Sequence, residues 1–139
     1  MAAVLNKIVG KKVKSFTLVE LMVIVAILAV LTTLAIPNVI KARMSANDVM
    51  AQTTLKSISS ALETYFSKNN GYPAVTDDLL DPDPPYLNKD YFLEPYAGFV
   101  FTYEPDGTTE YAVLAEPTFF GRTGTTTFVI TTGGVFQEY

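Results

Sequence analysis

Residues 14–37 of this 139-residue chain, KSFTLVELMVIVAILAVLTTLAIP, decide its fold. Residues 16–36 form an apolar segment of 21 residues, and its single acidic residue is Glu20. A helix of that length rises about 31 Å, which matches the hydrocarbon core of a bilayer. The segment therefore predicts a membrane-spanning helix, and Glu20 is the residue whose presence needs a reason.

The charges on the two sides of the segment predict its orientation. Four lysines and no acidic residue occupy residues 1–15, whereas Lys41 and Arg43 follow the segment. The larger number of basic residues before the segment favours a cytoplasmic N-terminus. A secretory signal peptide has a similar basic start, but its apolar region usually has only about 7–15 residues. The segment here is longer, contains an acid and continues into further helical pattern, so we expect a membrane anchor.

The helical pattern continues beyond Pro37, a residue that a membrane helix tolerates as a kink. Later apolar residues step by three and four, as one face of an amphipathic helix does: Leu55, Ile58, Leu62, Tyr65 and Phe66. We expect one helix over residues 16–68, bent near Pro37. It should end near Asn69-Asn70-Gly71, where Gly71 can adopt a positive φ and Pro73 follows.

The second half of the chain predicts a loop and then a sheet. Residues 71–98 hold five of the eight prolines, which excludes a regular helix or a central strand. We expect an ordered loop held by buried side chains, namely Tyr86, Tyr91, Phe92 and Leu93. Strand-like segments then flank Asp106-Gly107 and Gly133-Gly134, which predicts two hairpins in an antiparallel sheet of three or four strands. The fold class is α+β, with the amphipathic half of the helix packed on the sheet.

Composition excludes several classes of function. Without the lysines of residues 1–15, six basic residues remain against fourteen acidic ones, so nucleic acid is not expected as the main partner. The chain has no Cys and no His, which removes the commonest zinc ligands and the commonest general base. We expect no enzyme and no cofactor.

Two polar features of the second half call for a structural interpretation. Four acidic residues cluster in the proline-rich loop: Asp77, Asp78, Asp81 and Asp83. Such oxygens can bind calcium, but the spacing is not that of an EF-hand, so a solvated acidic loop is favoured over a metal site. Arg122 is the only basic residue after Lys89, and we expect it to bond a carboxylate or a carbonyl within the chain.

The N-terminal stretch resembles that of proteins with a class III signal peptide, namely type IV pilins and the pseudopilins of type II secretion. The resemblance rests on the basic leader, the apolar stem and five positions: Phe16, Thr17, Leu18, Glu20 and Pro37. The order of long helix, loop and antiparallel sheet also fits this family. One position departs from the pattern, because Ser15 stands where the family usually has Gly.

The resemblance implies a division of the chain and a processing step. Residues 1–15 would be a prepilin leader, residues 16–37 a helical stem for the membrane and then the filament core, and residues 38–139 a globular head. The head would comprise an amphipathic helix over 38–70, the loop over 71–98 and the sheet over 99–139. A prepilin peptidase would cleave between Ser15 and Phe16 and then N-methylate Phe16.

The same resemblance gives Glu20 a role. A carboxylate near a helix start is favoured by the helix dipole, and Phe16 and Glu20 lie four residues apart on one helix face. Glu20 would pair with the new amine of Phe16, in its own subunit or a neighbour, and so set the register of assembly.

These inferences lead to three hypotheses. The first is a structural subunit of a type IV pilus-like filament, inserted in the inner membrane and then polymerised at the cell surface or in the periplasm by an assembly platform and its ATPase. The second is the major pseudopilin of a type II secretion system, with the same fold. The third is a single-pass, membrane-anchored binding domain or enzyme.

Overall fold

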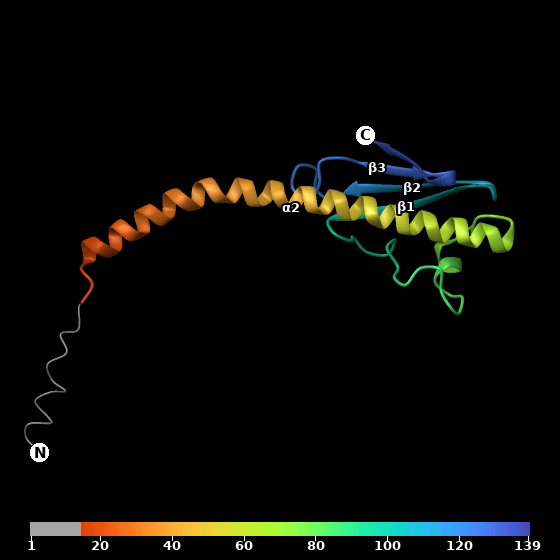
Figure 1. Ribbon diagram of the computed structural model, residues 1–139, viewed down its shortest axis with the longest axis horizontal. Coiled ribbons are helices and arrows are strands. Elements are labelled where there is room, and N and C mark those ends of the chain that lie inside the picture. Colours follow the sequence, from red (N-terminus) through yellow and green to blue (C-terminus); the bar gives the residue numbers. More distant parts are fainter. Residues whose placement is uncertain (1–14) are drawn as a thin grey trace, which may run out of the picture. The chain divides into compact units, whose positions relative to one another are not determined.

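The computed structural model describes residues 15–139, so of the expected leader only Ser15 lies within the described residues. One long helix, α2 (Leu18–Asn69), is followed by a short 3-10 helix, η1 (Thr76–Leu79). The strands are β1 (Phe99–Asp106), β2 (Glu110–Pro117), β3 (Phe128–Thr131) and β4 (Val135–Glu138), with the turn η2 (Thr132–Gly134) before β4 (Figure 1). This order of elements confirms the predicted α+β fold.

The chain divides into two compact units between Asn38 and Val39. We call residues 16–37 the stem and residues 39–139 the head. The helix α2 belongs to both, and Pro37 lies inside it. Proline has no amide hydrogen to donate at this turn, and the side-chain amide of Asn38 donates to the Leu34 carbonyl at 3.3 Å close by. The predicted continuity of the helix through Pro37 is therefore confirmed, whereas the bend remains a prediction.

The end of α2 differs from the prediction in its positive-φ residue. Asn70, with φ 55°, takes the left-handed conformation, and Gly71 does not. Asn adopts this conformation more readily than most residues, and its amide donates to the Phe66 carbonyl at 2.8 Å. Gly71 instead lies beside the β1–β2 hairpin, where a Cβ would make an ordinary contact with Thr108 at 3.4 Å. The next amide, that of Tyr72, donates to the Thr108 carbonyl.

The sheet is a four-stranded antiparallel meander in the order β1-β2-β3-β4. Phe99 lies opposite Pro117 at one end of the first hairpin, and Asp106 lies opposite Glu110 at the other. Gly107, with φ 66°, forms the turn that the Asp-Gly pair predicts. Both predicted hairpins are therefore confirmed.

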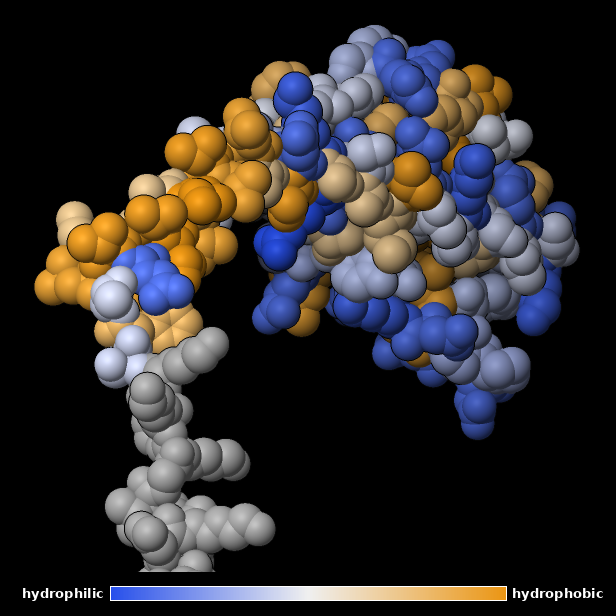
Figure 2. Space-filling model, turned by 60° about the vertical axis from the view of Figure 1, so that its left-hand side comes forward, coloured by the Kyte–Doolittle hydropathy of each residue, from blue (hydrophilic) through white to orange (hydrophobic). Residues whose placement is uncertain are grey.

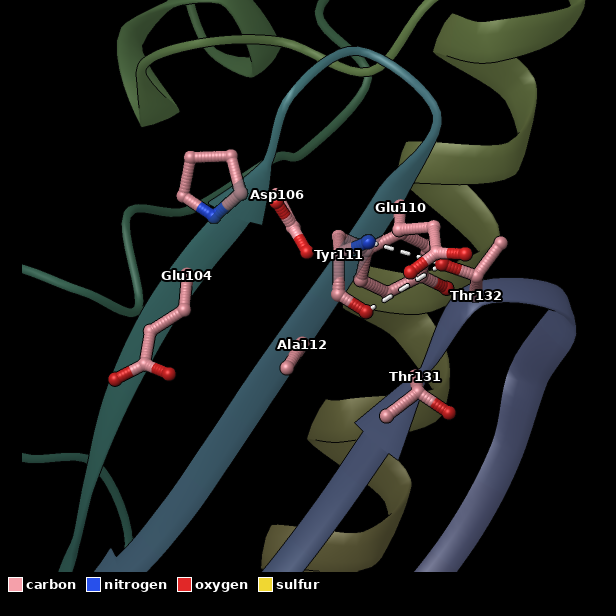
Figure 3. A pocket seen from close by; sticks show the side chains of 8 residues that line it. Glu104, Asp106, Glu110, Tyr111, Ala112, Thr131 and Thr132 are labelled. Atoms are coloured by element: carbon pink, nitrogen blue, oxygen red, sulfur yellow. Dashed lines mark hydrogen bonds between the residues drawn. The ribbon is translucent and has the colours of Figure 1, made fainter.

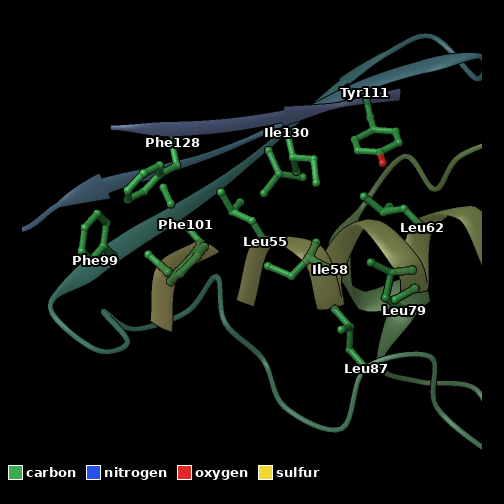
Figure 4. Packing of buried hydrophobic residues seen from close by; sticks show 14 of the residues in the cluster. Leu55, Ile58, Leu62, Leu79, Leu87, Phe99, Phe101, Tyr111, Phe128 and Ile130 are labelled. Atoms are coloured by element: carbon green, nitrogen blue, oxygen red, sulfur yellow. The ribbon is translucent and has the colours of Figure 1, made fainter. Parts of the chain in front are cut away.

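The core of the head lies between the helix and one face of the sheet (Figure 4). Alternate residues of β1, β2 and β3 are buried, as expected for a sheet covered on one face. The largest fully buried aliphatic side chains come from the helix, η1 and the sheet: Leu55, Ile58, Leu62, Leu79, Val113 and Ile130. The amphipathic face predicted from Leu55 onward is therefore confirmed.

The proline-rich loop is ordered, but one predicted anchor is wrong. Tyr91 packs against Phe101 with ring centroids 6.2 Å apart, and Phe92 is partly buried against the core. Leu93, by contrast, is 79% exposed. The amides of Phe92 and Leu93 both donate to Asp90 Oδ1, and this local turn is what fixes the backbone there.

Candidate functional site

The N-terminal end of α2 is closed by a side chain. Thr17 precedes the first helical residue, and its Oγ1 accepts a hydrogen bond from the amide of Glu20 at 3.2 Å. The Thr17 carbonyl accepts the first intrahelical bond, from the amide of Leu21 at 3.2 Å. This is the geometry of an N-cap residue, in which a threonine oxygen satisfies one of the free amides of the first turn.

Glu20 occupies the third helical position after this cap. The pattern Thr-x-x-Glu before an apolar run is a known sign of a helix start, since the two side chains can satisfy each other's backbone amides. Here the Thr17 half of that arrangement is present. The Glu20 side chain is exposed in the first turn, where the helix dipole favours an anion. The carboxylate is therefore accessible to a partner outside its own stem.

Ser15 and Phe16 precede the cap without regular secondary structure. Phe16 is 66% exposed. The structure thus brings Phe16, Thr17 and Glu20 together at one helix end, whereas Pro37 lies at the other end of the stem.

The stem carries a continuous apolar surface (Figure 2). Its most apolar 18-residue window has a mean hydropathy of 2.7, and none of that window is buried. Two shallow apolar grooves follow the stem beside Ala26, one between Val23 and Leu31 and the other between Leu18 and Ala29. By length and composition α2 is able to cross a membrane. Within residues 15–139 of a single copy, this surface has no protein partner.

Within the head, a polar cluster around Glu63 links α2 to the loop and the sheet. The Tyr72 hydroxyl donates to the Glu63 carboxylate at 3.1 Å, and the Tyr111 hydroxyl lies 3.2 Å from the same group. The amide of Gly133 donates to it at 3.0 Å, and the Tyr111 hydroxyl lies 2.8 Å from Ser59 Oγ. One helical carboxylate thus holds the entry to the loop, the start of β2 and the β3–β4 turn.

Burial and the Glu63 charge make these phenols hard to ionise. Burial, followed by the hydrogen bond and the charge of Glu63, raises the pKa of Tyr72 to about 12. The pKa of Tyr111 is also raised, chiefly by burial. Burial likewise raises the pKa of Tyr103 to about 12, and its hydroxyl donates to the Pro73 carbonyl at 2.7 Å. The phenols therefore remain neutral donors at physiological pH.

The acidic loop residues lie around η1. Asp77 and Asp78 are within it, and the Asp77 carbonyl accepts from the amides of Leu80 and Asp81. Across residues 15–139 no group of three or more acidic side chains is arranged to hold a metal ion.

Sequence reasoning missed two features of this site. The Thr17 cap has a local signal, the Thr-x-x-Glu spacing. The Glu63 cluster has none, because residues from four separate parts of the chain form it.

Residues 10–36 match the family model of the prokaryotic N-terminal methylation motif. The chain is 35% identical over 92 residues to a type II secretion system core protein G of Pectobacterium carotovorum subsp. carotovorum, covering 60% of this chain and 59% of that protein. It is 36% identical over 66 residues to a type IV major pilin protein of Myxococcus xanthus, covering 48% of this chain and 30% of that protein. It is 39% identical over 62 residues to a type IV wide pilus major component of Thermus thermophilus, covering 45% of this chain and 47% of that protein.

The order of elements is consistent with a pilin fold, and the capped apolar stem carries the prokaryotic N-terminal methylation motif. Over 45–60% of its length, the chain is similar both to type IV pilins and to a type II secretion system core protein G. It spans 30–59% of the lengths of the three relatives named above.

Proposed function

We propose that this chain is the structural subunit of a type IV pilus-like filament. The observation that carries the proposal is the stem: a fully exposed apolar helix whose one acidic residue lies in its first turn. An apolar surface of this size needs either lipid or protein around it. A filament subunit uses both in succession, the membrane before assembly and other stems afterwards.

Processing would convert the N-terminal end of the stem into an assembly site. A prepilin peptidase would cleave between Ser15 and Phe16, and methylation of the new amine would keep its positive charge. Phe16 and Glu20 are four residues apart, a separation at which helical side chains are neighbours. The exposed Glu20 carboxylate would then pair with the amine of Phe16 in the same or a neighbouring subunit.

The stems would pack side by side in the filament core. The shallow grooves beside Ala26 are suited to receive the larger side chains of another helix, in the way that ridges fit into grooves. A repeated contact between unlike surfaces does not close and gives a helical filament. Pro37 would loosen the helix locally during this packing.

The same proposal defines location and partners. Before assembly the chain would cross the inner membrane once, with its N-terminus in the cytoplasm, as the lysines before the stem favour. The filament would lie at the cell surface or in the periplasm. Its partners would be other copies of itself, the prepilin peptidase, and an inner-membrane platform with its ATPase.

The major pseudopilin of a type II secretion system is the second candidate. One observation favours it: the similarity to the Pectobacterium core protein G extends over 92 residues, compared with 66 and 62 for the two pilin relatives. This function would use the same stem and the same polymerisation. A third and weaker candidate is a single-pass, membrane-anchored binding domain that keeps its leader.

Mass spectrometry of the N-terminus tests the proposal directly. Material sheared from cells should contain filaments by electron microscopy, and their subunits should begin at N-methylated Phe16. A mature protein that retains residues 1–15 in the membrane would contradict the filament function and favour the anchored domain. Filaments that appear only when a secretion system is overproduced would favour the pseudopilin.

A further inference from the structure

The β2–β3 connection, residues 118–127, is a hydrogen-bonded loop with exposed aromatic side chains. We call it the arginine loop. Within it, Thr123 Oγ1 accepts from the Phe119 amide at 3.0 Å, and the Gly121 amide donates to the Gly124 carbonyl at 2.8 Å. Asn47 of α2 donates to the Thr123 carbonyl at 2.8 Å. The loop is therefore held in one conformation by its own backbone and by the helix.

Two contacts fix the same loop to the core. Asp48 of α2 accepts hydrogen bonds from the amide and the hydroxyl of Thr125, at 3.2 and 3.0 Å. Gly124 is buried so closely over Phe99 that a Cβ at this position would overlap the ring. A side chain there would displace the loop or the ring.

The arginine loop exposes side chains that make no contact needed by its own head. Phe119 is 62% exposed and Phe120 is 73% exposed. Arg122 is exposed, and among the hydrogen bonds of residues 15–139 only its backbone amide takes part. The prediction that Arg122 bonds a group of its own chain is therefore wrong. Arginine beside aromatic residues on a preorganised loop is typical of the residues that dominate protein interfaces.

The opposite end of the sheet carries a surface of complementary charge. An open groove of about 590 Å³ lies over the small side chain of Ala112, which is flanked by Glu104 on β1 and Thr131 on β3 (Figure 3). Asp106 and Glu110 also line it, and no basic residue does. These two carboxylates are cross-strand neighbours, and like charges directly opposite each other destabilise a sheet. We call this surface the acidic groove.

The two surfaces lie at opposite ends of the β1–β2 hairpin. The arginine loop begins after Pro117, opposite Phe99, whereas Asp106 and Glu110 are at the other end. Strands of eight residues separate these ends by about 23 Å at 3.3 Å per residue. One head can therefore use both surfaces at the same time, each with a different copy.

We propose that the arginine loop of one copy docks in the acidic groove of the next, with Arg122 facing the groove carboxylates and Phe119 or Phe120 covering Ala112. The partner is a second copy of this chain, because the head itself carries both the basic, aromatic loop and an acidic groove with room for it. The contact joins two unlike surfaces of neighbouring heads, so it repeats without closing and extends a filament. It rests on the proposed filament function and adds a specific contact between heads to the packing of stems.

Cross-linking in assembled filaments tests this contact, because the chain has no cysteine of its own. We would combine Phe120→Cys with Ala112→Cys in the full chain, shear the filaments and treat them with a short bismaleimide. A ladder of covalent dimers, trimers and longer species is expected on denaturing gels. Either single substitution should give no ladder, since each contact needs one cysteine from each copy.

A matched pair controls for crowding in the filament. Phe120→Cys combined with Glu138→Cys, an exposed position at the end of β4, should give no ladder. A ladder from this control, or cross-links from Phe120→Cys alone to another protein, would overturn the proposal. Filaments that form normally while the Phe120 and Ala112 cysteines stay unlinked would overturn it too, and would leave the filament function standing. If the unsubstituted chain forms no filament, the proposed function itself fails.

Charge reversal provides an independent measurement. Arg122→Glu should abolish the ladder of the cysteine pair, and adding Glu104→Arg should restore it, because both side chains are exposed and neither supports the core. A ladder that is unchanged in Arg122→Glu would contradict the role of the charge.

Discussion

The stem and the head share one helix, but its apolar side chains are exposed in the stem and buried in the head. In the head, Leu55, Ile58 and Leu62 are fully buried against the sheet and the loop. In the stem, large apolar side chains such as Leu31 and Leu34 are more than half exposed. The head therefore contains the partners that it needs to fold, whereas no other part of residues 15–139 covers the stem. Changes in the two regions should have separable effects, on folding in one and on assembly in the other.

The largest effect is expected from the stem carboxylate. Glu20→Ala should abolish most filament formation, because the amine of Phe16 would have no acidic partner, while the denaturation midpoint of the head stays unchanged. Sheared filament yield and circular dichroism would measure the two effects. Glu138→Ala, an exposed carboxylate on β4, is the matched control and should assemble normally. Normal assembly of Glu20→Ala would contradict the role proposed for this acid.

The reverse separation is expected in the core of the head. Ile58→Ala removes a fully buried side chain and should lower the free energy of unfolding by about 2–5 kcal/mol. Leu34→Ala in the stem, where the side chain is 68% exposed, should leave the unfolding of the head unchanged. Urea denaturation of the full chain in detergent measures both. Equal losses in the two variants would mean that stem and head do not fold independently.

A smaller loss is expected at the polar cluster. Glu63→Ala leaves the hydroxyls of Tyr72 and Tyr111 and the amide of Gly133 without their acceptor, which should cost about 1–3 kcal/mol. The exposed Glu116 on β2 provides the comparison, since Glu116→Ala should change stability by less than about 0.5 kcal/mol. A similar small change at Glu63 would show that water replaces the carboxylate.

Alkaline pH should act on the head through the same cluster. The pKa of Tyr72 is about 12 in the folded head and about 10 in an unfolded chain, so the folded state holds this proton more firmly. Its contribution to stability is complete below pH about 10 and is lost as the pH rises towards about 12. Tyr72→Phe should therefore reduce the fall in melting temperature over this range, whereas Tyr139→Phe, at an exposed position, should not. An unchanged slope in Tyr72→Phe would contradict this account.

The smallest effect is expected at the helix cap. Thr17→Ala removes the acceptor for the Glu20 amide and should cost about 1 kcal/mol at the first turn. Hydrogen exchange of residues 18–20 in detergent would show faster exchange, and Thr17→Ser should restore protection because its hydroxyl can accept the same bond. Equal exchange in all three proteins would mean that the cap does not hold the helix end.

Much of this architecture follows from local sequence. The helix through residues 18–69, both hairpins and the buried face from Leu55 onward were predictable, because periodicity, Asp106-Gly107 and Gly133-Gly134 act over a few residues. The cap at Thr17 was also within reach of a local pattern. What failed was detail set by packing: Asn70 instead of Gly71 at the helix end, and an exposed Leu93.

The contacts between distant segments could not be predicted from the sequence. The Glu63 cluster depends on the exact register of helix, loop and sheet, which no spacing along the chain reveals. The exposure of the Arg122 side chain depends on how the loop packs, with Gly124 against Phe99. Such features are fixed by tertiary structure. A pattern of residue types therefore predicts the helices and strands better than it predicts the contacts between them.

The position of the Thr17 cap has a consequence for proteolysis. The helix begins at Leu18, so the bond between Ser15 and Phe16 lies outside its hydrogen-bonded turns. Proteases act most readily on chain segments that are free of regular structure. An enzyme that cuts this bond would not need to unwind the stem, and the helix end would be already formed when the new terminus appears.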